Sequence, residues 1–274
     1  MQKKVWLITG VSKGLGKELA KQVNGAGDIV IGTVRNLEHK ITFEESLGAK
    51  AFVIDLAETK QIPQLVSSVI KEYGQIDVLV NNAGYGAFGM IEEFDEQEII
   101  NQLNVNFIAV WKLCQSVLPH MRNKGYGTIV QISSRLGITA GVGNGLYASS
   151  KFALEGMSEA LKQEVEPFGI KVLLAELGAL RTDFFGASVR YAKNNLSPYR
   201  ENWGDIRAHT KNRNGKQPGN PIKVAKAIIE AVNNGVPTFR LPLTAGTIES
   251  IKAKIAEFQT CIALNEDVAR SMDY

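Results

Sequence analysis

The sequence has few of the residues that build metal centres or disulfide frameworks. Its 274 residues include only two cysteines, Cys114 and Cys261, which lie far apart. Three histidines, His39, His120 and His209, are equally scattered, and no two of them have the i, i+4 spacing that places two metal ligands on one helix face. The sequence therefore predicts neither a bound metal nor a disulfide scaffold, and it favours a reducing, cytoplasmic setting.

Long hydrophobic runs and a strong charge of either sign are also missing. No run approaches the roughly 18 apolar residues of a membrane span. The apolar run at 5–8 is too short for a signal peptide and leads directly into a glycine-rich loop. The net charge of +3 is small for this length, which argues against a basic nucleic-acid face. We therefore expect neither a nucleic-acid partner nor a membrane partner.

Short apolar segments alternate with helical segments along the first two thirds of the chain. The expected strands are almost continuously apolar, as in a parallel sheet buried on both faces, and lie at 5–9, 29–34, 51–55, 78–81, 128–133 and 171–176. The expected helices lie at 14–25, 59–73, 95–123 and 147–167. This alternation predicts a doubly wound α/β fold with ligands at the carboxyl ends of the strands.

The pattern changes after residue 176. Residues 183–220 are irregular and rich in glycine, asparagine, arginine and aromatics, which is typical of a lid over a binding site. A helix at 221–233, an edge strand at 238–241 and an amphipathic helix at 246–263 are expected to follow. Because no linker or repeat divides the chain, we expect one domain over 1–274 with a C-terminal helical extension.

The stretch TGVSKGLG at 9–16 directly follows the first expected strand. Gly10 permits a tight turn, Gly14 lets backbone N–H groups approach a pyrophosphate, and Gly16 lets the helix pack closely on the strand. The start of the helix adds positive partial charge. A plain turn needs one glycine rather than three, so the loop, including Ser12 and Leu15, favours a dinucleotide site over a simple connection.

The end of the second strand carries no acid to hold a ribose. An NAD enzyme usually places one about 20 residues beyond the glycines, but this chain has Val34 followed by Arg35, and Asp28 and Glu38 are poorly placed to substitute. Arg35 alone would be read as a solvated side chain. Together with Lys13 in the glycine loop, it predicts a clamp for the 2′-phosphate of NADP.

The ends of the third and fourth strands add further candidates. Asp55 and Leu56 follow the third strand, where a carboxylate suits the adenine amino group or, equally, a helix N-cap. The small residues Asn82, Ala83 and Gly84 follow the fourth strand. They would let the chain pass beside a flat cofactor, or would simply form a turn.

A serine, a tyrosine and a lysine form the strongest chemical constellation. Tyr147 and Lys151 are four residues apart on an expected helix and share a face. A free tyrosine has a pKa of about 10, and we expect the Lys151 ammonium to lower it. Ser133 or Ser134, at the end of the preceding strand, would hydrogen-bond a substrate carbonyl. The alternative is an ordinary pair on a helix surface.

All these pieces occur in order on one chain, and the sequence resembles the short-chain dehydrogenase/reductase family. The resemblance covers most of residues 4–185 and rests on TGVSKGLG at 9–16, Asp55, NNAG at 81–84, NVN at 104–106, ISS at 132–134 and YASSK at 147–151. It implies a single Rossmann domain with a seven-stranded parallel sheet and helices on both faces.

The resemblance also implies residue roles. Asn106 would hold a helix kink and a water of the proton relay, and Ser134 rather than Ser133 would be the catalytic serine. Tyr147 would be the general acid/base, and Lys151 would bind the nicotinamide ribose.

The stretch at 176–184 is similar to the family's E-P-G-x-x-R-T-D-F segment. This similarity places Gly178 and Thr182 at the cofactor, with Thr182 against the nicotinamide carboxamide. The family usually has proline where this chain has Leu177.

The sequence thus predicts an NADP(H)-dependent oxidoreductase that interconverts a carbonyl and an alcohol. The alternatives are a non-catalytic NADP(H)-binding sensor and an epimerase or dehydratase on the same scaffold. The lid aromatics favour an apolar or aromatic substrate, unless they only anchor the lid: Phe184, Phe185, Tyr191, Tyr199 and Trp203. A stretch at 215–221 resembles a hydroxysteroid-dehydrogenase-like branch.

The resemblance further implies a homodimer or homotetramer, because family members commonly pair the two long helices expected at 95–123 and 147–167. These helices carry apolar residues beyond what one core needs: Leu103, Phe107, Trp111, Phe152, Leu154 and Met157. The C-terminal helix would be an alternative cover for that surface.

Overall fold

A seven-stranded parallel sheet forms the centre of the protein. The computed structural model describes residues 3–186 and 188–274, so residue 187 of the expected lid lies outside the described part. The strands are β1 (Val5–Ile8), β2 (Ile29–Val34), β3 (Lys50–Val53), β4 (Val78–Asn81), β6 (Gly127–Ser134), β7 (Ile170–Leu177) and β9 (Arg240–Leu243). Their order is β3-β2-β1-β4-β6-β7-β9. This confirms the predicted fold, with strand ends displaced by one or two residues.

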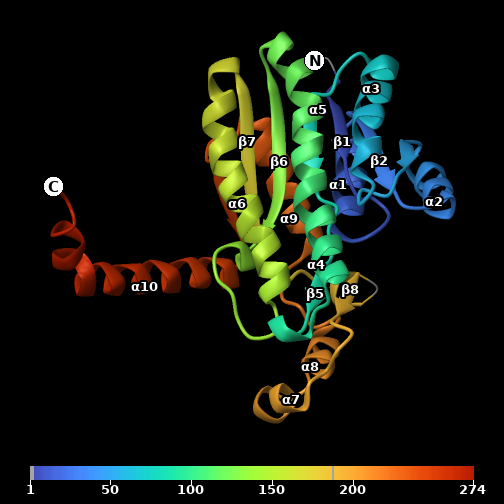
Figure 1. The fold of residues 1–274 in the computed structure, drawn as a ribbon. Helices are drawn as coiled ribbons and strands as arrows, with labels where there is room; N and C mark the ends of the chain where they lie inside the picture. Colours follow the sequence, from blue (N-terminus) through green and yellow to red (C-terminus); the bar gives the residue numbers. More distant parts are fainter. Residues whose placement is uncertain (1–2, 187) are drawn as a thin grey trace.

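Helices cover both faces of this sheet (Figure 1). One face packs against α1 (Gly14–Gly25), α2 (Leu37–Leu47) and α9 (Pro221–Asn233), and the other against α3 (Ile62–Tyr73), α5 (Ala109–Lys124) and α6 (Gly145–Val165). In β1, Trp6 belongs to the first apolar cluster and Leu7 to the second. The strands are continuously apolar because both faces are buried.

The helix expected at 95–123 is interrupted. It consists of α4 (Glu96–Leu103), a π-helical segment (Asn104–Ile108) and α5. Asp95 caps α4, accepting a hydrogen bond from Glu98 N at 2.8 Å. A single π-helical turn inside a helix often marks a functional site.

Helix α2 and the short strands β5 (Gly86–Phe88) and β8 (Val189–Tyr191) were not expected from the sequence. Helix α2 begins after Asn36, whose side chain accepts from His39 N at 2.8 Å, and ends at Gly48 with φ of 62°. Strand β5 pairs in parallel with β8. This second sheet ties the expected lid to the body of the protein.

The segment 183–220 is more ordered than its composition indicated. Besides β8 it contains α7 (Ser197–Trp203) and α8 (Ile206–Arg213). The buried Glu93 accepts a hydrogen bond from Leu196 N at 2.8 Å. An isolated bridge between Leu180 and Gly219 joins the two ends of the segment at its base.

Helix α10 (Ala245–Arg270) is longer than the expected 246–263 and projects away from the body (Figure 1). Only Thr247 is buried. The alternative in which this helix covers the long helices of its own chain is therefore wrong. Within the described residues, no helix combines the length and apolar character needed to cross a membrane.

Candidate active site

A cavity of about 620 Å³ gathers most of the predicted site residues at the carboxyl ends of the strands. The predicted residues on its wall are Gly10, Ser12, Lys13, Gly14, Leu15, Arg35, Asp55, Leu56, Asn82, Ala83, Gly84, Ser134, Tyr147, Lys151, Gly178 and Thr182. Gly16 and Asn106 lie behind this wall rather than on it. Cavities of this size are typical of small-molecule and cofactor sites.

The glycine loop has the conformation that its spacing requires. Gly10 and Gly14 have φ of 72° and 59°, a region that other residues rarely occupy. A Cβ on Gly16 would lie 2.3 Å from the Gly10 carbonyl oxygen and 2.4 Å from Asn82 Nδ2. The third glycine is therefore needed for close packing of α1 against the loop.

Asn82 fixes the glycine loop from the neighbouring strand. Its Nδ2 donates to Thr9 O at 2.8 Å and to Gly10 O at 3.1 Å. The Thr9 hydroxyl accepts from the backbone N–H groups of Asn82 and Ala83, both at 3.0 Å. The 82–84 stretch is thus a support for the loop and not merely a turn.

The two predicted cations lie on the cavity wall. Lys13 immediately precedes α1, and Arg35 is exposed just beyond β2. Asp28 does not line the cavity, because its carboxylate accepts from Lys4 N and Trp6 Nε1, both at 3.0 Å. Asp55 does line it, with Oδ1 accepting from Ala57 N at 3.0 Å within its own turn.

The two adjacent serines have different partners. Ser134 lies close enough to the Tyr147 hydroxyl to lower its pKa, and its Oγ accepts from Leu136 N at 3.1 Å. Ser133 instead donates to the buried carboxylate of Glu155. The geometry thus favours Ser134 as the serine that faces a substrate.

The pKa of Tyr147 differs from the expectation. Burial raises the pKa of the phenol to about 12, and the hydrogen bond with Ser134 opposes this only in part. Lys151 Nζ lies 5.9 Å from the ring centroid and donates to Ile132 O at 2.7 Å. The pKa of Tyr147 is thus raised where the sequence predicted a lowering, because burial of the phenol dominates and Lys151 Nζ donates to a backbone carbonyl instead.

Burial also acts on the lysine. It lowers the pKa of Lys151 to about 8, and the negative charge of Glu155, one turn further along α6, opposes the change. A lysine with this pKa changes protonation close to physiological pH. Burial therefore favours the neutral form of both Tyr147 and Lys151 relative to the free side chains.

Asn106 lies in the π-helical segment and is almost fully buried. Its Nδ2 donates to Tyr85 O at 3.0 Å and to Ser150 Oγ at 3.1 Å, and its Oδ1 accepts from Tyr85 N at 3.2 Å. The side chain thus connects the helix irregularity to the loop after β4 and to α6. This placement agrees with the implied role at a helix kink.

The structure around the end of β7 accounts for two residues, Leu177 and Gly178. Leu177 is buried as the last residue of β7, paired with Ser134 on one side and Leu243 on the other. A Cβ on Gly178 would lie 2.0 Å from Thr244 Oγ1, so a larger residue would displace Thr244. The substitution for the family proline therefore leaves the strand intact.

Only two of the five lid aromatics reach the cavity. Phe184 and Phe185 line it, with the Phe184 ring centroid 5.7 Å from that of Tyr147. Tyr199 instead donates to Glu92 at 2.8 Å, and Trp203 is 60% exposed. The five aromatic residues are therefore divided between the cavity wall and the outer part of the segment 183–220.

A profile of the short chain dehydrogenase family matches residues 4–192. A 3-ketodihydrosphingosine reductase of Bacteroides thetaiotaomicron is 42% identical over 185 residues, which make up 67% of this chain and 66% of that protein. Oxidoreductase BOA17 of Botryotinia fuckeliana is 32% identical over 249 residues, or 90% of each chain. The crystal structure of a short-chain dehydrogenase from Streptomyces avermitilis has a TM-score of 0.90, with 35% identity over 98% of this chain and all of the other.

The chain belongs to the short-chain dehydrogenase family. It is an oxidoreductase that acts on CH–OH groups with NAD(P).

The cavity fits the nicotinamide dinucleotide that short-chain dehydrogenases use. Helix α1 begins inside the glycine loop. The backbone N–H groups of its first turn have no partner within the helix, so they are available to a phosphate group. A side chain on Gly10 or Gly16 would collide with neighbouring atoms of the loop and of residues 82–83, whereas Gly14 is required by its φ of 59°. Lys13, at the end of the loop, adds a positive charge to the same wall.

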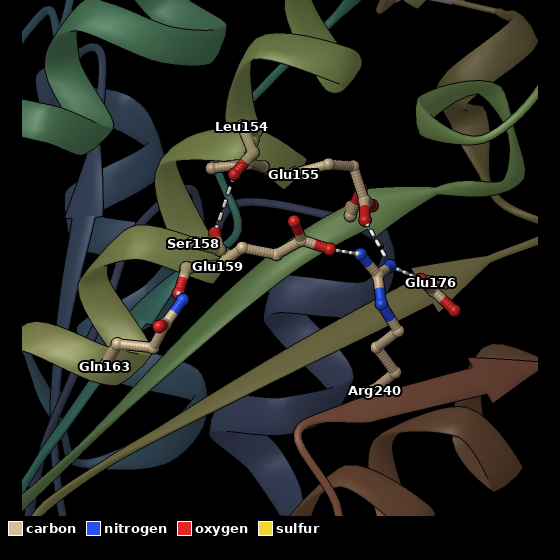
Figure 2. A network of polar contacts seen from close by, with 8 residues as sticks. Leu154, Glu155, Ser158, Glu159, Gln163, Glu176 and Arg240 are labelled. Carbon is tan, nitrogen blue, oxygen red and sulfur yellow. Dashed lines mark hydrogen bonds and ion pairs between the residues drawn. The ribbon is translucent and has the colours of Figure 1, made fainter. Parts of the chain in front are cut away.

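The sequence analysis missed a charged network behind the dehydrogenase site. Arg240 on β9 binds the carboxylates of Glu155, Glu159 and Glu176 (Figure 2). Glu176 is fully buried on β7, and Glu155 also accepts from Ser133. The detectable signal was a glutamate inside an otherwise apolar strand, since a buried carboxylate requires a cationic or hydrogen-bonding partner.

Proposed function

We propose that this short-chain dehydrogenase is an NADP(H)-dependent enzyme that interconverts a ketone or aldehyde and the corresponding alcohol. The observation that carries the proposal is the placement of Ser134 and Tyr147 together on the cavity wall, with Lys151 one helical turn further along α6. A pure cofactor sensor would have no need for a proton donor in this position.

The nicotinamide cofactor supplies or accepts the hydride. Ser134 and Tyr147 donate hydrogen bonds to the carbonyl oxygen of the substrate, which orients it and stabilises the negative charge that develops there. In the reductive direction Tyr147 transfers its hydroxyl proton to that oxygen.

The basic residues at the opposite end of the cavity support a preference for NADP(H). Lys13 and Arg35 approach the same end of the cavity from α1 and β2. The uncharged Val34 occupies the position where NAD enzymes usually have an acid that binds the ribose. Two cations would attract a 2′-phosphate, whereas an acid at 34 would repel it.

The aromatic wall near Tyr147 supports an apolar or aromatic substrate. Phe88 and Phe184 line the cavity with ring centroids 6.1 and 5.7 Å from that of Tyr147, and Phe185 packs against both of them. The name of the Bacteroides relative, a reductase of a 3-keto compound, supports a ketone. Assignment to a hydroxysteroid-dehydrogenase-like branch stays a prediction.

The test is the loss of NADPH absorbance when purified protein is mixed with a panel of apolar and aromatic ketones and aldehydes. We expect turnover with at least one apolar carbonyl. Tight NADPH binding without turnover on any substrate would favour the sensor. Product formation without any change in the cofactor would favour an epimerase or dehydratase.

We also propose a homodimer or homotetramer that pairs the long helices α5 and α6. Trp111 and Phe152 are 44% and 43% exposed on these helices, whereas Leu154, which was expected at this surface, belongs to the core. Light scattering should show a smaller assembly for Trp111→Glu and the parental assembly for the control Asn123→Glu, an exposed site on another face of α5.

We further propose a cytoplasmic setting, supported by the two cysteines. Cys114 is buried, whereas Cys261 is exposed on the projecting helix, so they have no opportunity to pair with each other.

A further inference from the structure

Helix α10 has an apolar face that its own chain leaves uncovered. Its first turn is held by the buried Thr247, whose hydroxyl donates to Leu243 O at 3.0 Å. Beyond that turn, Ile255, Phe258 and Ile262 are 51%, 55% and 59% exposed. Exposed apolar residues grouped on one helix indicate a surface that binds something.

The spacing of these residues identifies the kind of surface. Isoleucine or phenylalanine occurs at 248, 251, 255, 258 and 262, which are separated by three, four, three and four residues. This spacing is that of the seam of a two-helix coiled coil. Leu264 and Val268 are also exposed but lie outside the repeat. We call residues 248, 251, 255, 258 and 262 the α10 seam.

The charges beside the seam favour another protein helix over a lipid surface. The helix carries Glu249, Lys252, Lys254, Glu257, Glu266, Asp267 and Arg270, so acids and bases are nearly balanced. Helices that lie on membranes usually have a strongly basic polar face. A mixed, nearly neutral set of charges is typical of helices that pair with one another.

We propose that α10 pairs with α10 of a second copy of this chain in an antiparallel coiled coil. Lys252 follows the seam residue Ile251, and Glu266 lies fourteen residues further along, which is the same heptad position. In an antiparallel pair the residues at this position face each other. Lys252 of each copy therefore lies beside Glu266 of the other, and the two-fold axis generates both ion pairs.

This alignment specifies the rest of the interface. Phe258 of one copy lies opposite Ile262 of the other, and the two Cys261 side chains lie near the two-fold axis. The 26-residue helix is about 39 Å long at 1.5 Å per residue. Because each helix is rooted at its N-terminal end, antiparallel pairing keeps the two sheet domains at opposite ends and apart.

The exposed Cys261 allows a direct test on the full chain. A short bismaleimide should join two copies through Cys261 into a species of twice the 29.9 kDa chain mass, since Cys114 is buried and protected. Cys261→Ser should abolish this product. Adding Ala253→Cys to Cys261→Ser moves the thiol to the outer face of α10 and should not restore it.

A second pair of variants separates the seam from the proposed α5–α6 interface. Ile255→Asp with Ile262→Asp places two charges in the seam and should reduce the Cys261 cross-linking yield at least tenfold. In light scattering, the mass of the assembly should fall to half of the parental value. The matched control, Ala256→Asp with Ala263→Asp, places the same charges on the outer face and should behave like the parent. All four sites are exposed, so we expect the variants to fold. Unchanged binding of NADPH would show that they do.

Two outcomes would overturn the proposal. One is cross-linking of the seam variant at the parental yield. The other is a parent chain that does not cross-link but sediments with phosphatidylcholine and phosphatidylglycerol vesicles, in which case α10 is a lipid-binding helix. Both results concern α10 alone, so they do not depend on whether the protein reduces carbonyl compounds.

Discussion

Lys151 donates a hydrogen bond from Nζ to the carbonyl oxygen of Ile132 at 2.7 Å. This contact fixes α6 against β6, the strand that ends in Ser134. An ammonium group has three N–H donors, so two remain for other partners in the cavity. The lysine thus aligns the helix that carries Tyr147 with the strand that carries the serine, in addition to any contact with a ribose.

Removing the tyrosine hydroxyl should abolish most turnover without loss of cofactor. Tyr147→Phe keeps the ring that packs near Phe88 and Phe184 but has no transferable proton. We expect kcat to fall by about 10²–10⁴-fold, as for other general acids, with NADPH affinity close to parental. Stopped-flow hydride transfer and fluorescence titration measure the two quantities. Turnover near the parental rate would show that another group donates the proton.

Removing the lysine should affect both binding and chemistry. Lys151→Ala deletes the donor to Ile132 and the cation next to Tyr147. We expect weaker NADPH binding and a larger loss of kcat/KM than in Tyr147→Phe. Isothermal titration with NADPH is the decisive measurement. An unchanged affinity would exclude contact between Lys151 and the nicotinamide ribose.

The same lysine makes stability depend on pH. Burial lowers the pKa of Lys151 from 10.5 to about 8. Between these values the unfolded chain holds a proton that the folded chain has released, so this residue's contribution to the free energy of unfolding rises with pH. Below pH 8 both states are protonated, and the cost of burying the charge is fully present.

The parental Tm minus that of Lys151→Ala should therefore increase between pH 7.5 and 9.5. Measurements should stay below pH 10, because the raised pKa of Tyr147 makes folded-state stability fall between pH 10 and 12. A flat or falling difference would mean that the ammonium is well solvated in the folded protein.

Cofactor choice should depend on residues 34 and 35. Val34→Asp with Arg35→Ser places a carboxylate where a 2′-phosphate would lie and removes one of its two cations. We expect the ratio of kcat/KM for NADPH over NADH to reverse from above one to below one. The ratio is measured at fixed ionic strength, because the attraction is screened by salt. A parent enzyme that uses both cofactors equally would disprove the clamp.

Arg240 should be important for stability. Arg240→Ala leaves the fully buried Glu176 without its cation, a defect that typically costs about 3–5 kcal/mol; the 38% exposed guanidinium favours the low end. The control is Lys226→Ala, which removes an exposed pair with Glu230 and should change the free energy of unfolding by less than about 1 kcal/mol. Urea unfolding of both variants distinguishes them, and equal losses would contradict the buried-pair argument.

The sheet and most of the cavity wall were predictable because their signals are local. Apolar runs locate β1, β2, β3, β4, β6 and β7, and the glycines need only their own backbone angles to define the loop. Helix α2 was missed because Phe43 is its only buried residue, so no apolar stripe marks it. Strands β5 and β8 are three residues each, and their pairing joins segments about a hundred residues apart, which no local pattern indicates.

The electrostatics of the site were the least predictable part. A lysine four residues after a tyrosine suggested a lowered pKa, but the sign depends on burial, which comes from the packing of α6 and the segment that carries Phe184. Apart from the family resemblance, the sequence does not distinguish Ser133 from Ser134. In the structure Glu155, from another element, accepts a hydrogen bond from Ser133, whereas Ser134 lines the cavity beside Tyr147.

The position of β9 near the end of the sequence has a consequence for folding. Glu176 and Arg240 are 64 residues apart, and the whole segment over the cavity, together with α9, must loop out before β9 pairs with β7. Closing so long a loop is entropically costly, which makes β9 one of the last strands to dock. Until then β7 is an open sheet edge with an unneutralised carboxylate in it. Such an edge is prone to pair with other chains, so defects in β9 should appear as aggregation during refolding before they appear as loss of catalysis.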